Sequence, residues 1–207
     1  MENTNYNVLI IGGGNMGETA AKRFIDGGWV GGIVVAEKDS GRREYLQKKL
    51  GGKVTICSSD QIKPTEAKIV ILAIKPQSTA DLYQDGLQLA PSSLLISIVA
   101  GVSLKSLAKG IRHQQIVRCM PNTAMKIGKS VTVWLPQTDL SEQNQLLAKK
   151  VFELWGTSYQ VDKEDHLNMA TALFGTGPAL VYTIVSAFMG SARLIGFPAY
   201  ELRSLVI

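Results

Sequence analysis

The chain has 207 residues, enough for one large domain or for one domain and part of a second, and too few for a multi-module scaffold. Hydrophobic residues make up 45% and charged residues 19%, which excludes a disordered protein. The net charge of +5 comes from scattered Lys and Arg, so we expect a surface that suits small anions and no nucleic-acid partner.

The first half of the chain alternates apolar runs with segments that read as helices. Strands buried on both faces are predicted at residues 8–11, 33–36, 69–74 and 94–98. Helices are expected at about residues 15–27, 41–50, 77–89 and 103–110. This alternation predicts an α/β fold with a doubly wound parallel sheet. Two edge strands, 117–120 and 131–135, and a helix over 141–155 behind the capping candidates Asp139 and Ser141 are expected to follow.

A long apolar stretch occupies the last part of the chain. From Leu167 to Ala192 no charged residue occurs, a length that could cross a bilayer. Gly175-Thr176-Gly177-Pro178 predicts a helix break within it, and no basic cluster flanks it as membrane topology would require. We therefore favour a pair of helices buried in a subunit interface over a membrane span.

Cysteine and histidine usage argues against metal sites and secretion. Cys57 and Cys119 form no CxxC pair, and the only histidines are His113 and His166, so no metal is expected. The segment from Met1 to Asn7 lacks the basic start and apolar run of a secretory signal. A reducing cytoplasm is therefore the expected location.

A glycine-rich segment joins the first expected strand to the first expected helix. Its residues are Gly12, Gly13, Gly14, Asn15, Met16 and Gly17. In a GxGxxG motif the first glycine allows the tight turn, the second lets the backbone approach a pyrophosphate, and the third lets the helix pack close to the strand. With free N–H groups at the helix start, this arrangement predicts a dinucleotide site.

The second expected strand ends in an acid. Glu37 lies twenty positions after Gly17, where a carboxylate can accept hydrogen bonds from the adenosine ribose and would repel a 2′-phosphate, which favours NADH. Lys38, Arg42 and Arg43 follow, and these cations could instead bind a 2′-phosphate. The choice between NADH and NADPH therefore stays open at this point.

Four further segments occur in the order and spacing of pyrroline-5-carboxylate reductase, which the chain resembles throughout. They are Ala73-Ile74-Lys75-Pro76, Ser97-Ile98-Val99-Ala100-Gly101-Val102, Arg118-Cys119-Met120-Pro121-Asn122-Thr123 and Thr171-Ala172-Leu173-Phe174-Gly175-Thr176-Gly177-Pro178-Ala179. The resemblance implies a Rossmann domain over residues 1–160, and an all-helical dimerisation and substrate domain that begins at 161–207. It also implies reduction of the cyclic imine 1-pyrroline-5-carboxylate to L-proline by NAD(P)H in a homodimer or a higher assembly of dimers.

The resemblance assigns further site residues. The cofactor would contact the glycine loop, Glu37, Lys38, Asp60, Ala73, Ile74, Lys75, Pro76, Ile98, Val99 and Ala100. The substrate would contact Glu164, Gly175, Thr176, Gly177 and Pro178, with Lys75 and Thr176 in the catalytic positions. For Glu164, a carboxylate that favours a helix start through the helix dipole is an equal alternative.

The chain also departs from the family pattern. It has Phe174, Thr176 and Ser186 where the family usually has two serines and an acid, and Glu37 and Asp60 stand where the family commonly has neutral residues. A Ser-Pro-Gly-Gly-Thr-Thr loop that binds the substrate carboxylate in the family has no match, and the chain ends at Ile207 within an expected helix. We therefore expect either part of a longer chain or a shortened relative.

These departures leave two functional hypotheses. The first is the reductase itself. The second is a dinucleotide-binding relative with impaired catalysis and a regulatory or assembly role.

Overall fold

The computed structural model describes residues 8–29, 31–62, 67–198 and 201. The helix expected at Ile207 lies outside these residues. Within them, eight strands form one sheet in the order β3-β2-β1-β4-β5-β6-β7-β8. The strands are β1 (Val8–Ile11), β2 (Ile33–Glu37), β3 (Thr55–Ser58), β4 (Ile69–Leu72), β5 (Leu94–Ser97), β6 (Ile116–Met120), β7 (Ser130–Pro136) and β8 (Gly156–Gln160). All neighbours pair in parallel except β6 with β7.

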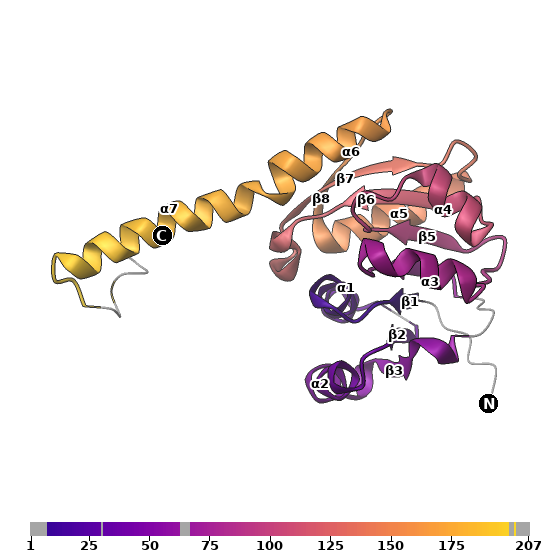
Figure 1. The fold of residues 1–207 in the computed structure, drawn as a ribbon, viewed down its shortest axis with the longest axis horizontal. Coiled ribbons are helices and arrows are strands. Elements are labelled where there is room, and N and C mark those ends of the chain that lie inside the picture. Colours follow the sequence, from indigo (N-terminus) through magenta and orange to yellow (C-terminus); the bar gives the residue numbers. More distant parts are fainter. Residues whose placement is uncertain (1–7, 30, 63–66, 199–200, 202–207) are drawn as a thin grey trace.

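Helices cover both faces of this sheet (Figure 1). They are α1 (Asn15–Asp26), α2 (Ser40–Leu50), α3 (Thr79–Gln84), α4 (Leu104–Ile111), α5 (Glu142–Trp155), α6 (Glu164–Ala170) and α7 (Gly177–Leu194). One core joins α1, α2 and α5 to the sheet through large side chains such as Phe24, Leu46 and Trp155. The opposite core includes Leu104, Leu107 and Ile111 of α4 and partly buried residues of α3. The predicted doubly wound α/β fold is therefore confirmed.

The four apolar strand predictions and the positions of α1, α2, α4 and α5 are confirmed. Ser141, not Asp139, caps α5, because its side chain accepts a hydrogen bond from the Asn144 N–H. The helix expected over 77–89 is shorter: a 3₁₀ turn over Pro76–Ser78 precedes α3, and Gly86, with φ of 70°, follows its end.

The expected edge strands are in fact interior, since β3 and β8 form the edges. Both edge strands are short and largely polar, and most of their residues are half-buried or exposed. An edge strand packs on fewer neighbours than a central one, so its sequence needs no continuous apolar run. This is why the sequence pattern did not reveal them.

The last helical segment leaves the body of the molecule as a long arm (Figure 1). Its base is packed, because Leu167 and Ala170 of α6 are buried against Val133 of β7. A π-helical stretch, Thr171–Gly175, and a turn at Thr176 separate α6 from α7, so the predicted interruption between two helices is present, although the two helices continue as one arm. Pro178 lies in the first turn of α7, where a residue without an N–H is tolerated.

The arm is apolar and uncovered. By length and composition alone, Glu164–Leu194 would suffice to cross a membrane. Beyond its packed base, the most apolar 18 residues of this segment contain no buried residue. Leu180, Ile184 and Phe188 are 64%, 57% and 63% exposed. Patches of this kind mark sites of association.

Candidate functional site

A cleft of about 1040 Å³ opens where β1, β2 and β4 end. The chain runs from β1 to β2 on one side and reaches β4 on the other, so the strand order reverses beside β1. Open α/β sheets bind ligands at this kind of position. The lining includes Gly12, Gly14, Glu37, Lys38, Asp60, Ala73, Ile74 and Lys75 among the predicted site residues.

The glycine loop has the backbone geometry that its motif requires. Gly12 has a φ of 99°, and a Cβ there would lie 2.6 Å from the carbonyl oxygen of Ala73. A Cβ on Gly17 would overlap the carbonyl oxygen of Gly12, so α1 packs against the loop only because this side chain is absent. Both positions exclude larger residues.

Gly14 leaves the start of α1 open to the cleft. It is the N-cap of α1 and provides no side-chain hydrogen bond to the helix. A Cβ built on Gly14 meets no atom within 4 Å. A helix N-terminus with uncapped N–H groups and open space in front of it fits the pyrophosphate of a dinucleotide.

The carboxylate of Glu37 is fixed by two backbone groups. The Gly13 N–H donates to Oε2 at 2.7 Å, and the Asp39 N–H donates to Oε1 at 2.9 Å. Glu37 therefore holds the glycine loop against the end of β2 while it lines the cleft. Asp60 lines the same region, and hydrogen bonds from the Ser58 side chain and from backbone lower its pKa.

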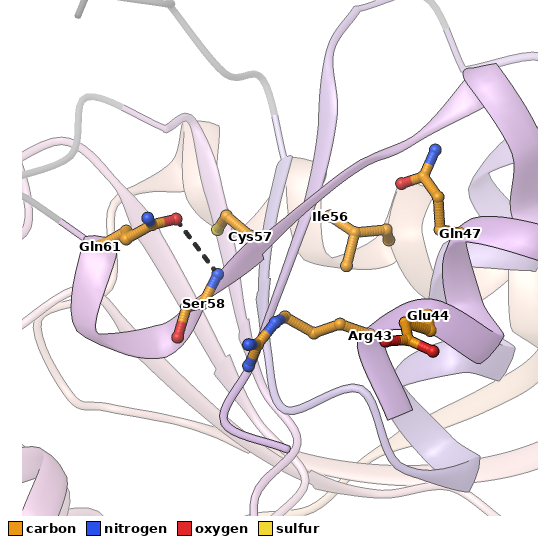
Figure 2. A pocket seen from close by; sticks show the side chains of 7 residues that line it. All are labelled: Arg43, Glu44, Gln47, Ile56, Cys57, Ser58 and Gln61. Carbon is orange, nitrogen blue, oxygen red and sulfur yellow. Dashed lines mark hydrogen bonds between the residues drawn. The ribbon is translucent and has the colours of Figure 1, made fainter. Parts of the chain in front are cut away.

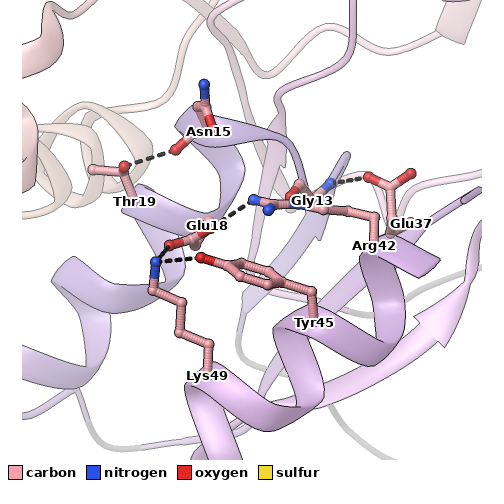
Figure 3. A network of polar contacts seen from close by, with 8 residues as sticks. All are labelled: Gly13, Asn15, Glu18, Thr19, Glu37, Arg42, Tyr45 and Lys49. Carbon is pink, nitrogen blue, oxygen red and sulfur yellow. Dashed lines mark hydrogen bonds and ion pairs between the residues drawn. The ribbon is translucent and has the colours of Figure 1, made fainter. Parts of the chain in front are cut away.

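A polar network lies behind the glycine loop (Figure 3). Arg42 Nε donates to the Gly13 carbonyl oxygen at 2.7 Å, and its Nη2 lies 2.6 Å from Glu18 Oε2. Lys49 Nζ lies 2.6 Å from Glu18 Oε1 and 2.7 Å from the Tyr45 hydroxyl. Burial raises the pKa of Glu18, but the hydrogen bonds from Lys49 and Arg42 outweigh burial and lower it overall.

The predicted nicotinamide-end residues lie at adjacent strand ends. Ala73 N–H donates to Ile11 O at 2.8 Å, and Ile98 N–H donates to Leu72 O at 3.1 Å. Lys75 is exposed and lines the cleft, whereas Pro76, Ile98, Val99 and Ala100 lie outside its lining. Val99 is 1% exposed and packs in the core.

The predicted substrate residues lie away from this cleft. Gly175, Gly177 and Pro178 belong to the arm, and the exposed Thr176 bonds to Thr171 of the same arm. Thr176 and Lys75 are not brought together within the single chain. Glu164 accepts a hydrogen bond from Arg118 rather than facing the cleft.

A smaller cavity of about 320 Å³ lies beside β3 (Figure 2). Arg43, Glu44, Gln47, Ile56, Cys57, Ser58 and Gln61 line it. Burial raises the pKa of the Cys57 thiol, which disfavours its reactive thiolate. Within the described ranges, no group of three or more His, Cys, Asp or Glu side chains is placed to hold a metal.

The sequence did not point to Glu18 or to the residues opposite the loop, and it suggested Arg42 as a ligand of a 2′-phosphate rather than as a support of the loop. Glu18 and Arg42 support the loop, and Ser78, Asp81 and Leu82 form the wall of the cleft on and just before α3. Arg42 and Lys49 are seven residues apart, which places them on one face of a helix, opposite the acid in the first turn of α1. That spacing is the signal from which the network could have been predicted.

Comparison with known proteins identifies the family. A family model described as NADP oxidoreductase coenzyme F420-dependent matches residues 7–101. Pyrroline-5-carboxylate reductase from Synechocystis sp. is 33% identical over 201 residues, which cover 96% of this chain and 74% of the relative. Pyrroline-5-carboxylate reductase 2 from Bacillus subtilis is 28% identical over 200 residues, with coverages of 95% and 71%.

Solved structures agree with these relatives. A pyrroline-5-carboxylate reductase from Coxiella burnetii superposes with a TM-score of 0.80 at 25% identity, covering 98% of this chain and 76% of that one. The enzyme from Streptococcus pyogenes, at 24% identity, shares the fold with a TM-score of 0.82, covering 96% of this chain and 74% of that one. The chain therefore belongs to the pyrroline-5-carboxylate reductase family.

Proposed function

We propose that this protein reduces 1-pyrroline-5-carboxylate to L-proline with NAD(P)H. Membership of the family makes it an NAD(P)-dependent oxidoreductase. The observation that carries the proposal is the uncapped start of α1 at Gly14, which faces a cleft large enough for a dinucleotide at the ends of the parallel strands.

The reaction requires little general acid–base catalysis from the protein. The protonated imine is already electrophilic at C5, so the site must mainly orient two flat rings and exclude competing reactions. The nicotinamide cofactor, when bound, supplies the hydride. Gly12 and Gly14 would hold the pyrophosphate end, Gly17 lets α1 pack close behind them, and Lys75 with its neighbours would orient the nicotinamide end.

The substrate side is proposed from the family resemblance. Gly175, Thr176, Gly177 and Pro178 would shape the substrate pocket, with Thr176 and Lys75 as catalytic positions. Thr176 lies on an arm that projects from the body, so a pocket that includes it together with Lys75 would need a second subunit (Figure 1). The uncovered apolar side chains of the arm support this arrangement.

We also propose a homodimer, or an assembly of dimers, located in the cytoplasm. A second copy that covers Leu180, Ile184 and Phe188 would remove these exposed apolar side chains from water. Purification without detergent as a monodisperse dimer would support the dimer, and recovery in the soluble cytoplasmic fraction of its host would support the location. A protein that stays in the membrane fraction would revive the bilayer alternative for Glu164–Leu194.

The activity test is oxidation of NADH or NADPH on addition of the imine. We expect turnover with proline as the product. Nucleotide binding without turnover would instead favour the alternative of a non-catalytic relative, for which Phe174 and Ser186 are the motivating departures. Binding measured by titration calorimetry beside the rate assay separates the two.

A further inference from the structure

Cations lie near the β2 end of the cleft, but most of them are bound to other groups of the protein and do not line it. Of the positive side chains near the end of β2, Lys38 lines the cleft, whereas Arg42, Arg43 and Lys49 do not. Arg43 Nη1 donates to the carbonyl oxygens of Glu37 and Lys38 at 3.0 Å and 2.7 Å. These two bonds to main chain fix Arg43 at the end of β2, where its charge helps to lower the pKa of Asp60.

Glu18 holds the other two cations. Its two carboxylate oxygens lie 2.6 Å from Arg42 Nη2 and 2.6 Å from Lys49 Nζ. Its side chain is 14% exposed, so this pairing is better shielded from water than a surface ion pair. Arg42 is further fixed by Gly13 and by stacking over Tyr45, 4.6 Å from the ring centre.

The cleft itself presents acids where a 2′-phosphate would lie. Glu37 and Asp60 line it, and Lys38 Nζ lies 3.8 Å from Asp81 Oδ2 on the opposite wall. A carboxylate offers about four acceptor sites, and Glu37 uses two for backbone N–H groups, which leaves two for ribose hydroxyls. A phosphate ester, with a charge of about −1.5 to −2, would meet like charge there.

We propose that this protein selects NADH over NADPH through Glu37, and that Glu18 is a positioning residue for this choice because it sequesters Arg42 and Lys49. The inference rests on the proposed function, because it concerns the cofactor of that same cleft. It assigns to Glu18, which does not line the cleft, an effect on which nucleotide is accepted.

The first test measures binding without substrate. The dissociation constants of NADH and NADPH are compared by fluorescence titration of the wild-type protein. We expect NADH to bind at least about tenfold more tightly, the loss expected when a hydrogen bond to a charged group is replaced by repulsion. Both nucleotides carry the pyrophosphate, so added salt should affect that contact equally. The difference between the two dissociation constants should therefore become smaller as salt screens the 2′-phosphate of NADPH.

The second test uses variants. Glu37→Gln should lower the preference for NADH about tenfold by removing the like charge. Glu18→Gln should release Arg42 and Lys49 and raise affinity for NADPH about threefold alone and more in the Glu37→Gln background. Glu44→Gln is the matched control: it removes one exposed carboxylate from the same helix, α2, outside the cleft, and should leave the ratio unchanged.

The ratio of the NADPH and NADH dissociation constants distinguishes a role of Glu18 in nucleotide selectivity from a role in supporting the glycine loop. If Glu18 only stabilised the loop, Glu18→Gln would weaken both nucleotides equally, and that result would overturn its assigned role. If Glu18→Gln folds poorly by circular dichroism, Glu18→Asp, which shortens the carboxylate, should shift the ratio in the same direction. Adding Arg42→Gln to Glu18→Gln should remove the gained affinity for NADPH.

The outcomes separate this inference from the proposed function. Equal or tighter binding of NADPH by the wild type overturns the inference and leaves the reductase intact. Failure of both nucleotides to bind overturns the proposed function, and the inference with it.

Discussion

Arg118 and Glu164 join the sheet to the base of the arm. Arg118 Nη1 lies 2.7 Å from Glu164 Oε1, and the same oxygen accepts a hydrogen bond from the Leu104 N–H at 2.8 Å. One carboxylate thus ties the first turn of α6 to β6 and to the start of α4. This contact gives Glu164 a structural role, and its role toward the substrate stays a prediction.

Loss of this carboxylate should destabilise the protein. Arg118 is 3% exposed, so Glu164→Gln leaves a buried guanidinium without its counter-ion. Because the Glu164 side chain is itself about one-third exposed, we expect a loss of about 2 kcal/mol, below the usual range for a fully buried pair. Urea unfolding measures this change. Asp165→Asn, an exposed acid in the same turn, is the control, and equal losses in the two variants would contradict the account.

Two glycines of the loop should respond differently to alanine. In Gly17→Ala the new Cβ overlaps the Gly12 carbonyl, so we expect overpacking to cost about 1–3 kcal/mol and nucleotide binding to fall with it. In Gly14→Ala the methyl group enters open space at the cleft, so stability should be kept while nucleotide affinity falls. Thermal melting and nucleotide titration on both variants make the comparison. A Gly17→Ala protein as stable as Gly14→Ala would refute the packing assigned here.

Stability should depend on pH through His113. The side chain is 5% exposed, and its Nε2–H donates to the Ser93 carbonyl oxygen at 2.7 Å. Burial lowers the pKa of His113, and the hydrogen bond to Ser93 opposes this only in part. The unfolded chain therefore binds the proton more readily, so the free energy of unfolding should fall as pH drops below about 6.5.

The slope of the free energy of unfolding against pH tests whether His113 is the titrating residue. One proton changes the free energy of unfolding by at most about 1.4 kcal/mol per pH unit. Urea unfolding between about pH 7.5 and pH 5.5 should show this decline in the wild type and a flatter profile in His113→Gln. Identical profiles would exclude His113 as the titrating group.

A charged residue on the apolar face of α7 should weaken the proposed dimer. Leu180, Ile184 and Phe188 repeat every four residues and so share one face of α7. Ile184→Glu places a charge within that stripe, and we expect the proposed dimer to dissociate in sedimentation velocity. Ser186→Glu lies on the opposite face by helix geometry and serves as the control. A dimer that persists unchanged in Ile184→Glu would place the interface elsewhere.

The sequence predicted the central sheet well and its edges poorly. Val8 to Ile11 and Ile69 to Leu72 are buried throughout, so their continuous apolar runs correctly predicted buried strands. The β8 residues Gly156 to Gln160 are polar and partly exposed, and nothing in their pattern indicates a strand until β7 supplies its partner.

The sequence predicted the part of the site whose residues follow a motif at fixed spacing along the chain. The glycine loop and Glu37 follow a motif that spans one β-α-β unit, and both line or support the cleft. The roles of Glu18 and Arg42 depend on how α1 and α2 pack side by side, which no local pattern states. The interruption predicted at Gly175 to Pro178 is present between α6 and α7, but the direction in which the arm continues depends on packing that no local pattern states.

The most direct measurement is the rate of NADH oxidation by the purified protein when 1-pyrroline-5-carboxylate is added, with L-proline identified in the product mixture. We expect turnover that depends on the imine and is reduced in Gly14→Ala. Absence of turnover with both NADH and NADPH, in a folded protein that binds the nucleotide, would contradict the proposed reductase.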